Sequence, residues 1–254
     1  MRPVITLLTD FGTADGYVAE MKGVILSLMP GAAVVDVSHD VAPHDVECGR
    51  LALARYWRRF PPGTVHVAVV DPGVGSARAA LAVRSDDRLL VGPDNGVLSP
   101  ALLVPGARAV ALPVPGQAAP TFHGRDVFAP AAAALAAGTP LDALGAPHER
   151  PVVRRTPEPH RRADGAIEGQ VISVDRFGNA ITNCLGVRGG TVEAGGAVLR
   201  VARTYAQAEP GALVAVCGST GLIEVAVRDG SAARELGLAR GSPIVYHPDA
   251  MGRG

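Results

Sequence analysis

Cysteine is scarce in this sequence. Cys48, Cys184 and Cys217 are the three cysteines among 254 residues, and they lie far apart. Their number is odd and no Cys-x-x-Cys pair occurs, which disfavours both a disulfide framework and a structural zinc site. Sparse, separated thiols predict a protein of a reducing compartment.

Long hydrophobic runs and an excess of charge of one sign are also missing. The first apolar run, residues 4–8, is too short for a signal-peptide core, and no stretch approaches the ~20 apolar residues of a membrane span. Basic and acidic residues balance at 24 each, which gives a formal net charge of zero. Such a chain favours neither nucleic acid nor an anionic membrane as partner, so we expect a cytoplasmic protein without either.

The first half of the chain alternates strand-like and helix-like patterns. Strand patterns lie at residues 3–9, 33–37, 64–70, 79–83, 88–91 and 107–112. Helical patterns lie at residues 17–29, 46–60 and 127–137. Asp45 and Asp126 are the expected N-caps of the second and third helices. Two successive βαβ units predict an α/β domain over residues 1–150, with a mostly parallel sheet flanked by helices.

The second half has a different composition. Residues 151–164 are rich in proline and arginine and lack periodicity, which indicates a connecting segment. From residue 165 to 254, short β-type runs alternate with glycines. This pattern predicts a smaller β-barrel-like C-terminal domain.

Polar residues gather where the predicted strands of the first half end. Asp10, Asp40 and Asp71 each follow a separate strand, and the sequence GPDNG at residues 92–96 follows another. In open parallel sheets, ligands bind beyond the carboxyl ends of the strands. Three carboxylates delivered by three strands therefore favour a polar ligand site at this edge over three separate helix caps.

Two other kinds of site can be weighed against the sequence. Gly73-Val74-Gly75 begins a dinucleotide fingerprint, but Arg78 takes the place of the third glycine and a strand pattern follows instead of a helix, so the motif fails. Residues 38–48 (SHDVAPHDVEC) hold many metal-ligand types without a metal-ligand spacing. Loop structure and ligand contacts explain this stretch better than a metal site does.

Two loop residues have open interpretations from the sequence alone. His123 precedes a glycine at a helix entry, where it either reaches a ligand or serves only the local structure. Phe177 lies in the strand connection DRFGN, and an exposed aromatic ring there suggests stacking on a planar ligand.

Seven motifs occur in order along the chain. They are TDFG with Asp15 at residues 9–15, VDVSHDVAPHDV at 35–46, VDPGVGSAR at 70–78, GPDNG at 92–96, FHGRD at 122–126, VDRFGN at 174–179 and GSTGL at 218–222. Together they resemble the S-adenosyl-L-methionine hydroxide adenosyltransferases, relatives of the fluorinating and chlorinating enzymes that attack the same substrate.

The resemblance implies an α/β domain followed by a β-barrel-like domain, in a homotrimer whose site lies between subunits. It implies hydrolysis of S-adenosyl-L-methionine to adenosine and L-methionine with no cofactor. By resemblance, the catalytic trio falls on Asp71, Arg78 and His123. Substrate-binding roles fall on Asp10 for the ribose, on Asp15 and Asp175 for the ammonium, on Ser219 for the carboxylate, and on Phe177, Asn179 and Tyr205 for the adenine.

The chemistry of the reaction suits these residue types. A sulfonium makes the neighbouring C5′ carbon electrophilic and leaves as a neutral thioether, so the missing ingredient is an aligned water relieved of a proton. Asp71 or His123 can accept that proton, and Arg78 can fix the carboxylate. The sequence leaves open which of the two is the base.

Two alternative functions are a non-catalytic sensor of S-adenosyl-L-methionine or adenosine and a halogenase that uses S-adenosyl-L-methionine. A sensor needs the ligand contacts but not the trio. By resemblance, halogenating members lack the trio as well, whereas Gly124 stands at a position that does not discriminate. Asp71, Arg78 and His123 therefore favour hydrolysis.

Overall fold

The computed structural model describes residues 2–186 and 189–249. The chain divides into two compact units, Met1–Arg155 and Thr156–Gly254, and each is described by itself below. Over the described residues, no helix combines the length and the apolar character needed to span a membrane.

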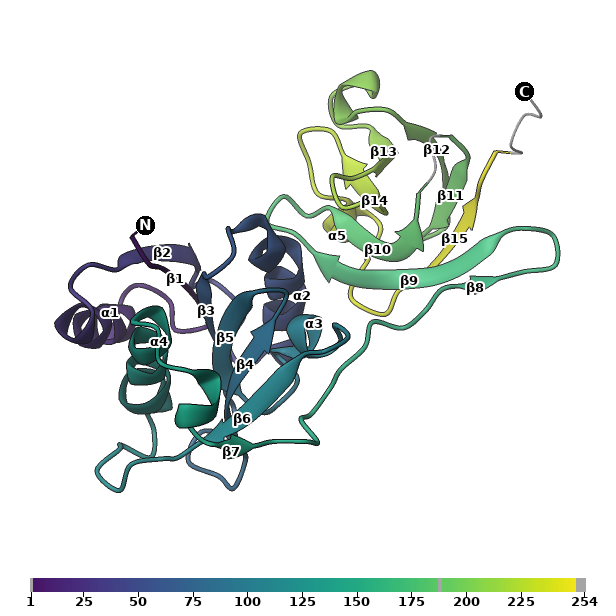
Figure 1. Cartoon of the computed structure of the whole chain (residues 1–254). Coiled ribbons are helices and arrows are strands. Elements are labelled where there is room, and N and C mark those ends of the chain that lie inside the picture. The colour runs from purple at the N-terminus through teal and green to yellow at the C-terminus, as the bar shows by residue number, and fades with distance from the viewer. Residues whose placement is uncertain (1, 187–188, 250–254) are drawn as a thin grey trace. The chain divides into compact units, whose positions relative to one another are not determined.

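Unit 1 is built on a seven-stranded sheet in the order β2-β1-β3-β5-β4-β6-β7 (Figure 1). Its strands are β1 (Val4–Thr9), β2 (Ala33–Ser38), β3 (Val65–Val69), β4 (Ala80–Ser85), β5 (Arg88–Pro93), β6 (Arg108–Leu112) and β7 (Ala146–Pro147). β2, β1, β3 and β5 pair in parallel, and β4 is inserted antiparallel between β5 and β6. The expected α/β domain is confirmed, with three parallel and three antiparallel pairings in its sheet.

Helices cover both faces of this sheet because its strands are apolar on both sides (Figure 1). α1 (Tyr17–Leu28) and α4 (Ala129–Ala136) pack on one face, against Val65 and Val67 among others. α2 (Val46–Tyr56) and α3 (Ser99–Leu102) pack on the other, where Ala68 and Val70 lie. Three short helical turns complete the unit: η1 (Trp57–Arg59), η2 (Gly124–Phe128) and η3 (Leu141–Ala143).

Unit 2 is a closed β-barrel (Figure 1). Its strands are β8 (His160–Arg161), β9 (Ile167–Val174), β10 (Ala180–Leu185), β11 (Thr191–Ala194), β12 (Ala197–Ala202), β13 (Leu213–Cys217), β14 (Leu222–Val227) and β15 (Pro243–His247). The strands follow one another in the order β10-β14-β13-β12-β11-β15-β9, and a further pairing of β10 with β9 closes the barrel. β8 pairs antiparallel with the beginning of β9. η4 (Tyr205–Gln207) and α5 (Ala232–Glu235) lie in its connections. The expected barrel-like domain is confirmed.

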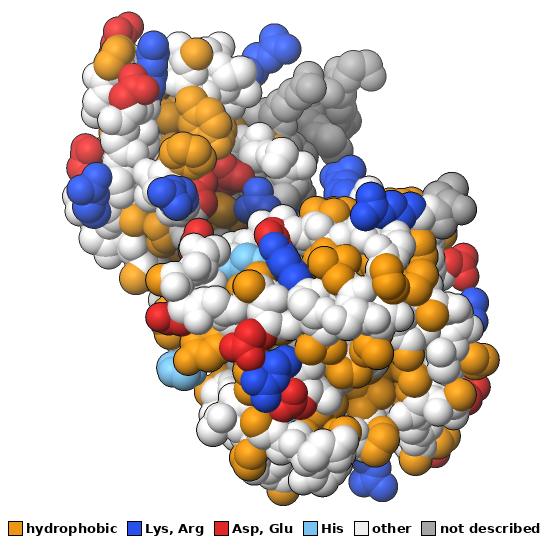
Figure 2. Space-filling view, turned by 90° about the vertical axis from the view of Figure 1, so that its left-hand side faces the viewer, with side chains coloured by type: hydrophobic (Ala, Val, Ile, Leu, Met, Phe, Trp, Pro, Cys, Tyr) orange, Lys and Arg blue, Asp and Glu red, His pale blue; other side chains and the backbone are white. Residues whose placement is uncertain are grey.

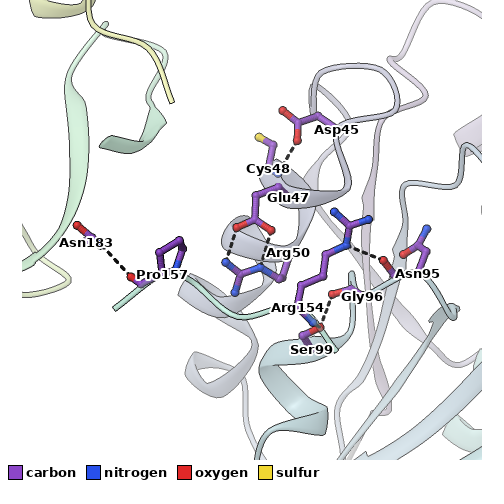
Figure 3. A network of polar contacts seen from close by, with 10 residues as sticks. All are labelled: Asp45, Glu47, Cys48, Arg50, Asn95, Gly96, Ser99, Arg154, Pro157 and Asn183. Atoms are coloured by element: carbon purple, nitrogen blue, oxygen red, sulfur yellow. Dashed lines mark hydrogen bonds and ion pairs between the residues drawn. The ribbon is translucent and has the colours of Figure 1, made fainter. Parts of the chain in front are cut away.

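The two expected helix caps have different outcomes. Asp45 caps α2, since its Oδ1 accepts the backbone N–H of Cys48 at 2.9 Å (Figure 3). Asp126 does not cap α4, because it lies inside the π-helical turn η2. Its carboxylate instead accepts the backbone N–H of Ala119 at 2.8 Å and an Arg125 guanidinium N–H at 2.7 Å. That expectation was wrong because the carboxylate has closer partners across the preceding loop.

Candidate active site

Three side chains from two loops meet beyond the end of β3: two from the β3–β4 loop and one from the segment before η2. Asp71 follows this strand by two residues, Arg78 lies just before β4, and His123 directly precedes η2. Arg78 donates from Nε to Asp71 Oδ1 at 3.0 Å and from Nη2 to Asp71 Oδ2, which makes a two-point guanidinium–carboxylate pair. The same Nη2 lies 3.0 Å from Nδ1 of His123. The structure thus brings together the trio that the sequence analysis singled out.

The trio is shielded from water. The side chains of Arg78 and Asp71 are 10% and 5% exposed, and His123 is buried. The Arg78 guanidinium also lies over the ring of Phe128, 5.5 Å from its centroid. Electrostatic interactions are stronger in such a place than in water, so these groups hold one another in fixed orientations.

The contact with Arg78 determines the protonation of His123. An arginine guanidinium has only N–H donors, so Nδ1 of His123 is the acceptor, and the proton of the neutral ring lies on Nε2. Burial and the neighbouring Arg78 charge lower the pKa of His123, and they outweigh the opposing effect of Asp71 and Asp126. His123 is therefore a neutral ring that offers Nε2–H as a donor.

The glycine-containing loop between Asp71 and Arg78 is a packed turn. Gly75 has a φ of +77°, and a Cβ at this position would lie 2.6 Å from the carbonyl oxygen of Pro120. The backbone N–H of Val74 and that of Ser76 donate within the same loop, to the carbonyls of Asp71 and Gly73. Gly75 thus allows the loop to approach the segment before His123, and this explains the second glycine of the Gly-x-Gly without a phosphate.

Asn95, in the GPDNG motif, supports the position of Asp71 and was not singled out from the sequence. Its Nδ2 donates to the carbonyl of Val70 at 2.8 Å, and its Oδ1 accepts the N–H of Val97 at 3.1 Å. Arg154 Nε donates to the Asn95 carbonyl at 2.9 Å (Figure 3). From the sequence, the one indication of its role is that Asn95 follows a predicted strand, as Asp71 does.

Asp10 and Asp15 lie beyond the end of β1. Asp10 Oδ2 accepts the backbone N–H of His44 at 2.8 Å. Asp15 is exposed in the turn that leads into α1. These two carboxylates therefore lie in the same turn region, close to each other along the chain and separate in sequence from the two loops of the trio.

Aromatic rings gather beside Gly124, the residue that follows His123. Phe11, Tyr17 and Phe122 contact one another edge to face, with centroids 5.3 to 6.2 Å apart. A Cβ at Gly124 would lie 3.2 Å from the rings of Phe11 and Phe122 and from Met21 Sδ. A side chain at position 124 would crowd this cluster.

The stretch rich in metal-ligand types uses its side chains within the chain. His39 is buried and lies 2.8 Å from Thr9 Oγ1 and 3.0 Å from Asp36 Oδ1. Glu47 accepts from Arg50 at 2.8 Å (Figure 3). Together with the helix cap at Asp45, these contacts give structural reasons for the composition of residues 38–48.

In unit 2, three of the predicted site residues share the tight turn between β9 and β10. Asp175 Oδ1 accepts the backbone N–H groups of Phe177 and Asn179, both at 2.9 Å, and Oδ2 accepts from Asn179 Nδ2 at 3.0 Å. Asn179 is buried, whereas the Phe177 side chain projects with 76% of its surface exposed. Asp175 thus shapes the turn that presents Phe177.

The other two predicted residues of unit 2 lie on neighbouring loops. Ser219 is exposed in the turn between β13 and β14, and Tyr205 begins η4. The hydroxyl of Tyr205 donates to Glu224 Oε2 at 2.6 Å. Glu224 is 5% exposed, and a Cβ at Gly218 would lie 1.9 Å from its other oxygen. Glu224, which the sequence analysis did not single out, connects Tyr205 with the turn that bears Ser219.

Comparison with protein families gives a match over most of the chain. The SAM hydroxide adenosyltransferase N-terminal domain matches residues 5–145, and the C-terminal domain of the same family matches residues 169–245. The chain belongs to the SAM hydroxide adenosyltransferase family. This confirms the resemblance drawn from the seven motifs.

Relatives with curated names cover the chain almost end to end. A protein of Thermus thermophilus named (R)-S-adenosyl-L-methionine hydrolase is 48% identical over 96% of this chain and 99% of its own length. One of the same name from Salinispora arenicola is 43% identical over 95% of this chain and 97% of its own. A fluorinase of Nocardia brasiliensis is 31% identical, with 96% of both chains covered.

Solved structures share the fold. A crystal structure of an uncharacterised conserved protein from Thermotoga maritima matches with a TM-score of 0.87 at 32% identity, over 96% of this chain and 99% of that one. A conserved hypothetical protein from Thermus thermophilus matches with a TM-score of 0.80 at 44% identity, over 97% and 100%.

Proposed function

We propose that this protein hydrolyses S-adenosyl-L-methionine to adenosine and L-methionine. The observation that carries the proposal is the buried trio, in which Arg78 bonds both Asp71 and His123. The hydrolase relatives at 43–48% identity support the same reaction. Their names specify the R configuration, so we propose the R sulfonium epimer as the substrate.

The proton positions in the trio suggest which residue orients the attacking water and which accepts its proton. Because Arg78 occupies Nδ1 of the neutral His123 ring, Nε2–H is a donor and orients the attacking water through its oxygen. Asp71 accepts from Arg78 at both oxygens but keeps further lone pairs, so it is the group that accepts the water proton. Arg78 holds both partners in place.

The reaction is then a direct displacement. The water oxygen forms a bond to C5′ as the C5′–S bond breaks, and the electron pair of that bond stays on sulfur, which leaves as the neutral thioether of methionine. The water proton passes to Asp71. The step needs no metal ion and no cofactor, because the positive sulfonium already makes C5′ electrophilic.

The remaining candidate residues serve to bind the substrate. Asp10 binds the ribose hydroxyls. Asp15 and Asp175 bind the ammonium group of the methionine part, and Ser219 binds its carboxylate. In this proposal Phe177 stacks on the adenine, with Asn179 and Tyr205 beside it. The exposure of Phe177 supports its part, since a large aromatic ring projecting from a rigid turn has the geometry of a stacking group.

We further propose that the protein is a homotrimer with sites shared between subunits, and that it acts in the cytoplasm. A surface for association is supported by the face that carries α1 and β2, where apolar side chains reach the surface (Figure 2). Tyr17, Leu26 and Leu28 on α1 and Val35 on β2 are 37% to 58% exposed. β2 is also an edge strand of its sheet.

Product analysis tests the function. Purified protein is incubated with each sulfonium epimer in chelator-treated buffer made with oxygen-18 water, with chloride or fluoride present. We expect adenosine carrying one label in its 5′-hydroxyl and unlabelled methionine. A halogenated nucleoside would instead support the halogenase alternative, and binding without any product would support a sensor. Loss of activity with chelator that added metal restores would contradict the metal-free mechanism.

A further inference from the structure

A chain of hydrogen bonds connects α1 and the end of β2 with the turn that follows β1. Lys22 Nζ on α1 donates to Asp36 Oδ2 at 2.5 Å. Asp36 Oδ1 lies 3.0 Å from His39 Nε2, and His39 Nδ1 lies 2.8 Å from Thr9 Oγ1. Thr9 Oγ1 also accepts the backbone N–H of Phe11 at 3.2 Å. The chain thus leads from a surface lysine to the backbone of the turn.

The protons of this chain have one consistent arrangement. Partial burial opposes ionisation of Asp36, but the hydrogen bonds from Lys22 and His39 outweigh it, and the pKa of Asp36 is lowered. His39 can donate to this carboxylate through Nε2–H, and in that tautomer Nδ1 accepts the hydroxyl proton of Thr9. The Thr9 oxygen then has a lone pair for the backbone N–H of Phe11. Each hydrogen bond of the chain then has one donor and one acceptor.

Further contacts tie the same two loops together. The backbone N–H of Gly12 donates to the carbonyl of His39 at 2.9 Å. The backbone N–H of His44 donates to Asp10 Oδ2 at 2.8 Å. Asp10 therefore sits between Thr9 and Phe11, both held by this chain, and its own carboxylate is oriented by the loop that His39 begins.

We propose that His39 is a positioning residue, which acts through Thr9 to set the orientation of the Asp10 carboxylate toward the ribose hydroxyls of the ligand. This inference rests on the proposed function for the identity of that ligand. The order Thr-His-Asp resembles a nucleophilic triad, but Thr9 has no exposed surface and its oxygen already accepts from Phe11. It cannot reach a substrate atom, so its role is to hold the turn.

The chain offers a matched control. Thr6, on the same strand, lies 2.8 Å from Nδ1 of His66 through its Oγ1. Both Thr6 and His66 are fully buried, as Thr9 is. Thr6→Val therefore removes a buried threonine–histidine hydrogen bond of the same length from the same sheet, without touching the turn that holds Asp10.

The test compares the affinity of adenosine with that of 2′,3′-dideoxyadenosine, by calorimetry, in the wild type and in Thr9→Val, His39→Asn and Thr6→Val. We expect Thr9→Val to weaken adenosine binding by about tenfold, the effect of losing one oriented hydrogen bond, and to leave dideoxyadenosine binding unchanged. A further variant, His39→Leu, removes the acceptor of the Thr9 hydroxyl and should lose the preference for adenosine as Thr9→Val does. His39→Asn, whose amide oxygen can accept that hydroxyl near the place of Nδ1, should keep most of the preference. Thr6→Val keeps all of it.

Several outcomes would overturn the inference. One is a folded Thr9→Val protein with the wild-type preference for adenosine, and another is an equal loss of affinity for both nucleosides. A wild type that does not prefer adenosine would remove the ribose role of Asp10 itself. A wild type that prefers adenosine yet leaves S-adenosyl-L-methionine intact would contradict the proposed hydrolysis alone, and the comparison of variants would still decide the role of His39.

Discussion

The candidate residues of unit 1 and those of unit 2 are held in different ways. Asp71 and Arg78 come from the β3–β4 loop and His123 from the segment before η2, and the three bond one another in a buried place. Phe177 and Ser219 are exposed in short turns between barrel strands. The groups assigned to chemistry are thus oriented by mutual contacts, whereas Phe177 and Ser219 are presented by the backbone of the turns that bear them.

This difference has a physical reason. A carboxylate and a guanidinium that leave water need each other, because an unpaired buried charge is costly. A ring that stacks on a ligand must stay open to it, so only its backbone can be fixed in advance, here by Asp175. Variants in the two regions should therefore affect different kinetic constants.

The largest expected effect comes from breaking the trio. Asp71→Asn keeps the shape but removes the proposed proton acceptor, and kcat should fall by about 10²–10⁴. Binding should be little changed, because other residues hold the substrate. Single-turnover rates and calorimetry measure the two quantities. The control is Asp87→Asn, at an exposed position with a φ of 57° that asparagine also adopts. Loss of binding with an unchanged rate would make Asp71 a substrate contact.

The exposed ring of unit 2 gives the opposite expectation. Phe177→Ala should raise KM by about tenfold to hundredfold, the effect of losing a base–aromatic stack, and should leave kcat within a few-fold. Phe177→Trp should restore most of the affinity. Val198→Ala, which truncates another exposed apolar side chain of the barrel, serves as the control. A fall in kcat with an unchanged KM would remove the distinction between the two regions.

Asn95 tests whether the support of Asp71 matters for the rate. Asn95→Ala removes the hydrogen bond to the Val70 carbonyl, so Asp71 should lose part of its alignment and kcat should fall by about tenfold. Thermal unfolding shows whether the variant is folded, and KM should stay near the wild-type value. An increase in KM alone would place the effect in the ligand-binding loops instead.

The smallest expected effect is a displaced pH profile. The pKa of His123 is lowered, so the ring stays neutral on acidification through its ordinary value of 6.5 and is protonated only further down. Protonation would put a hydrogen on Nδ1, which must accept from Arg78, and activity should then be lost. A plot of log kcat against pH should bend below 6.5. A bend at or above 6.5 would contradict the neutral, Arg78-bonded ring.

Much of the fold could be predicted from the sequence because its elements repeat strong local patterns. α1, α2 and the six longer strands of unit 1 lie within a few residues of their expected positions. The sequence did not predict β11 and β15, two short strands of unit 2. β11 pairs with β12 and β15, and β15 also pairs with β9. The pairings of β15 join segments so far apart in the sequence that a local pattern does not reveal them.

For the candidate site, the sequence predicted the trio but not the residues that support it. The motifs named Asp71, Arg78 and His123, and the position of Asp71 after a strand agreed with a site at the sheet edge. The supporting roles of Asn95 and Glu224 could not be predicted, because an asparagine in a turn and a glutamate in a strand are common in proteins of any function. Their importance lies only in what they contact.

By itself, the sequence determined the positions of the longer helices and strands of unit 1, the division into an α/β and a β-rich part, and the residue types available for chemistry. These follow from periodicity and composition, which act over a few neighbouring residues. The tertiary structure alone decided that Arg78 bonds a histidine 45 positions away, and hence which nitrogen of His123 carries the proton. It also decided that Asp126 bonds a neighbouring loop instead of capping a helix. Both outcomes depend on long-range approaches of buried polar groups, and each such group takes the partner that the packed chain brings within reach.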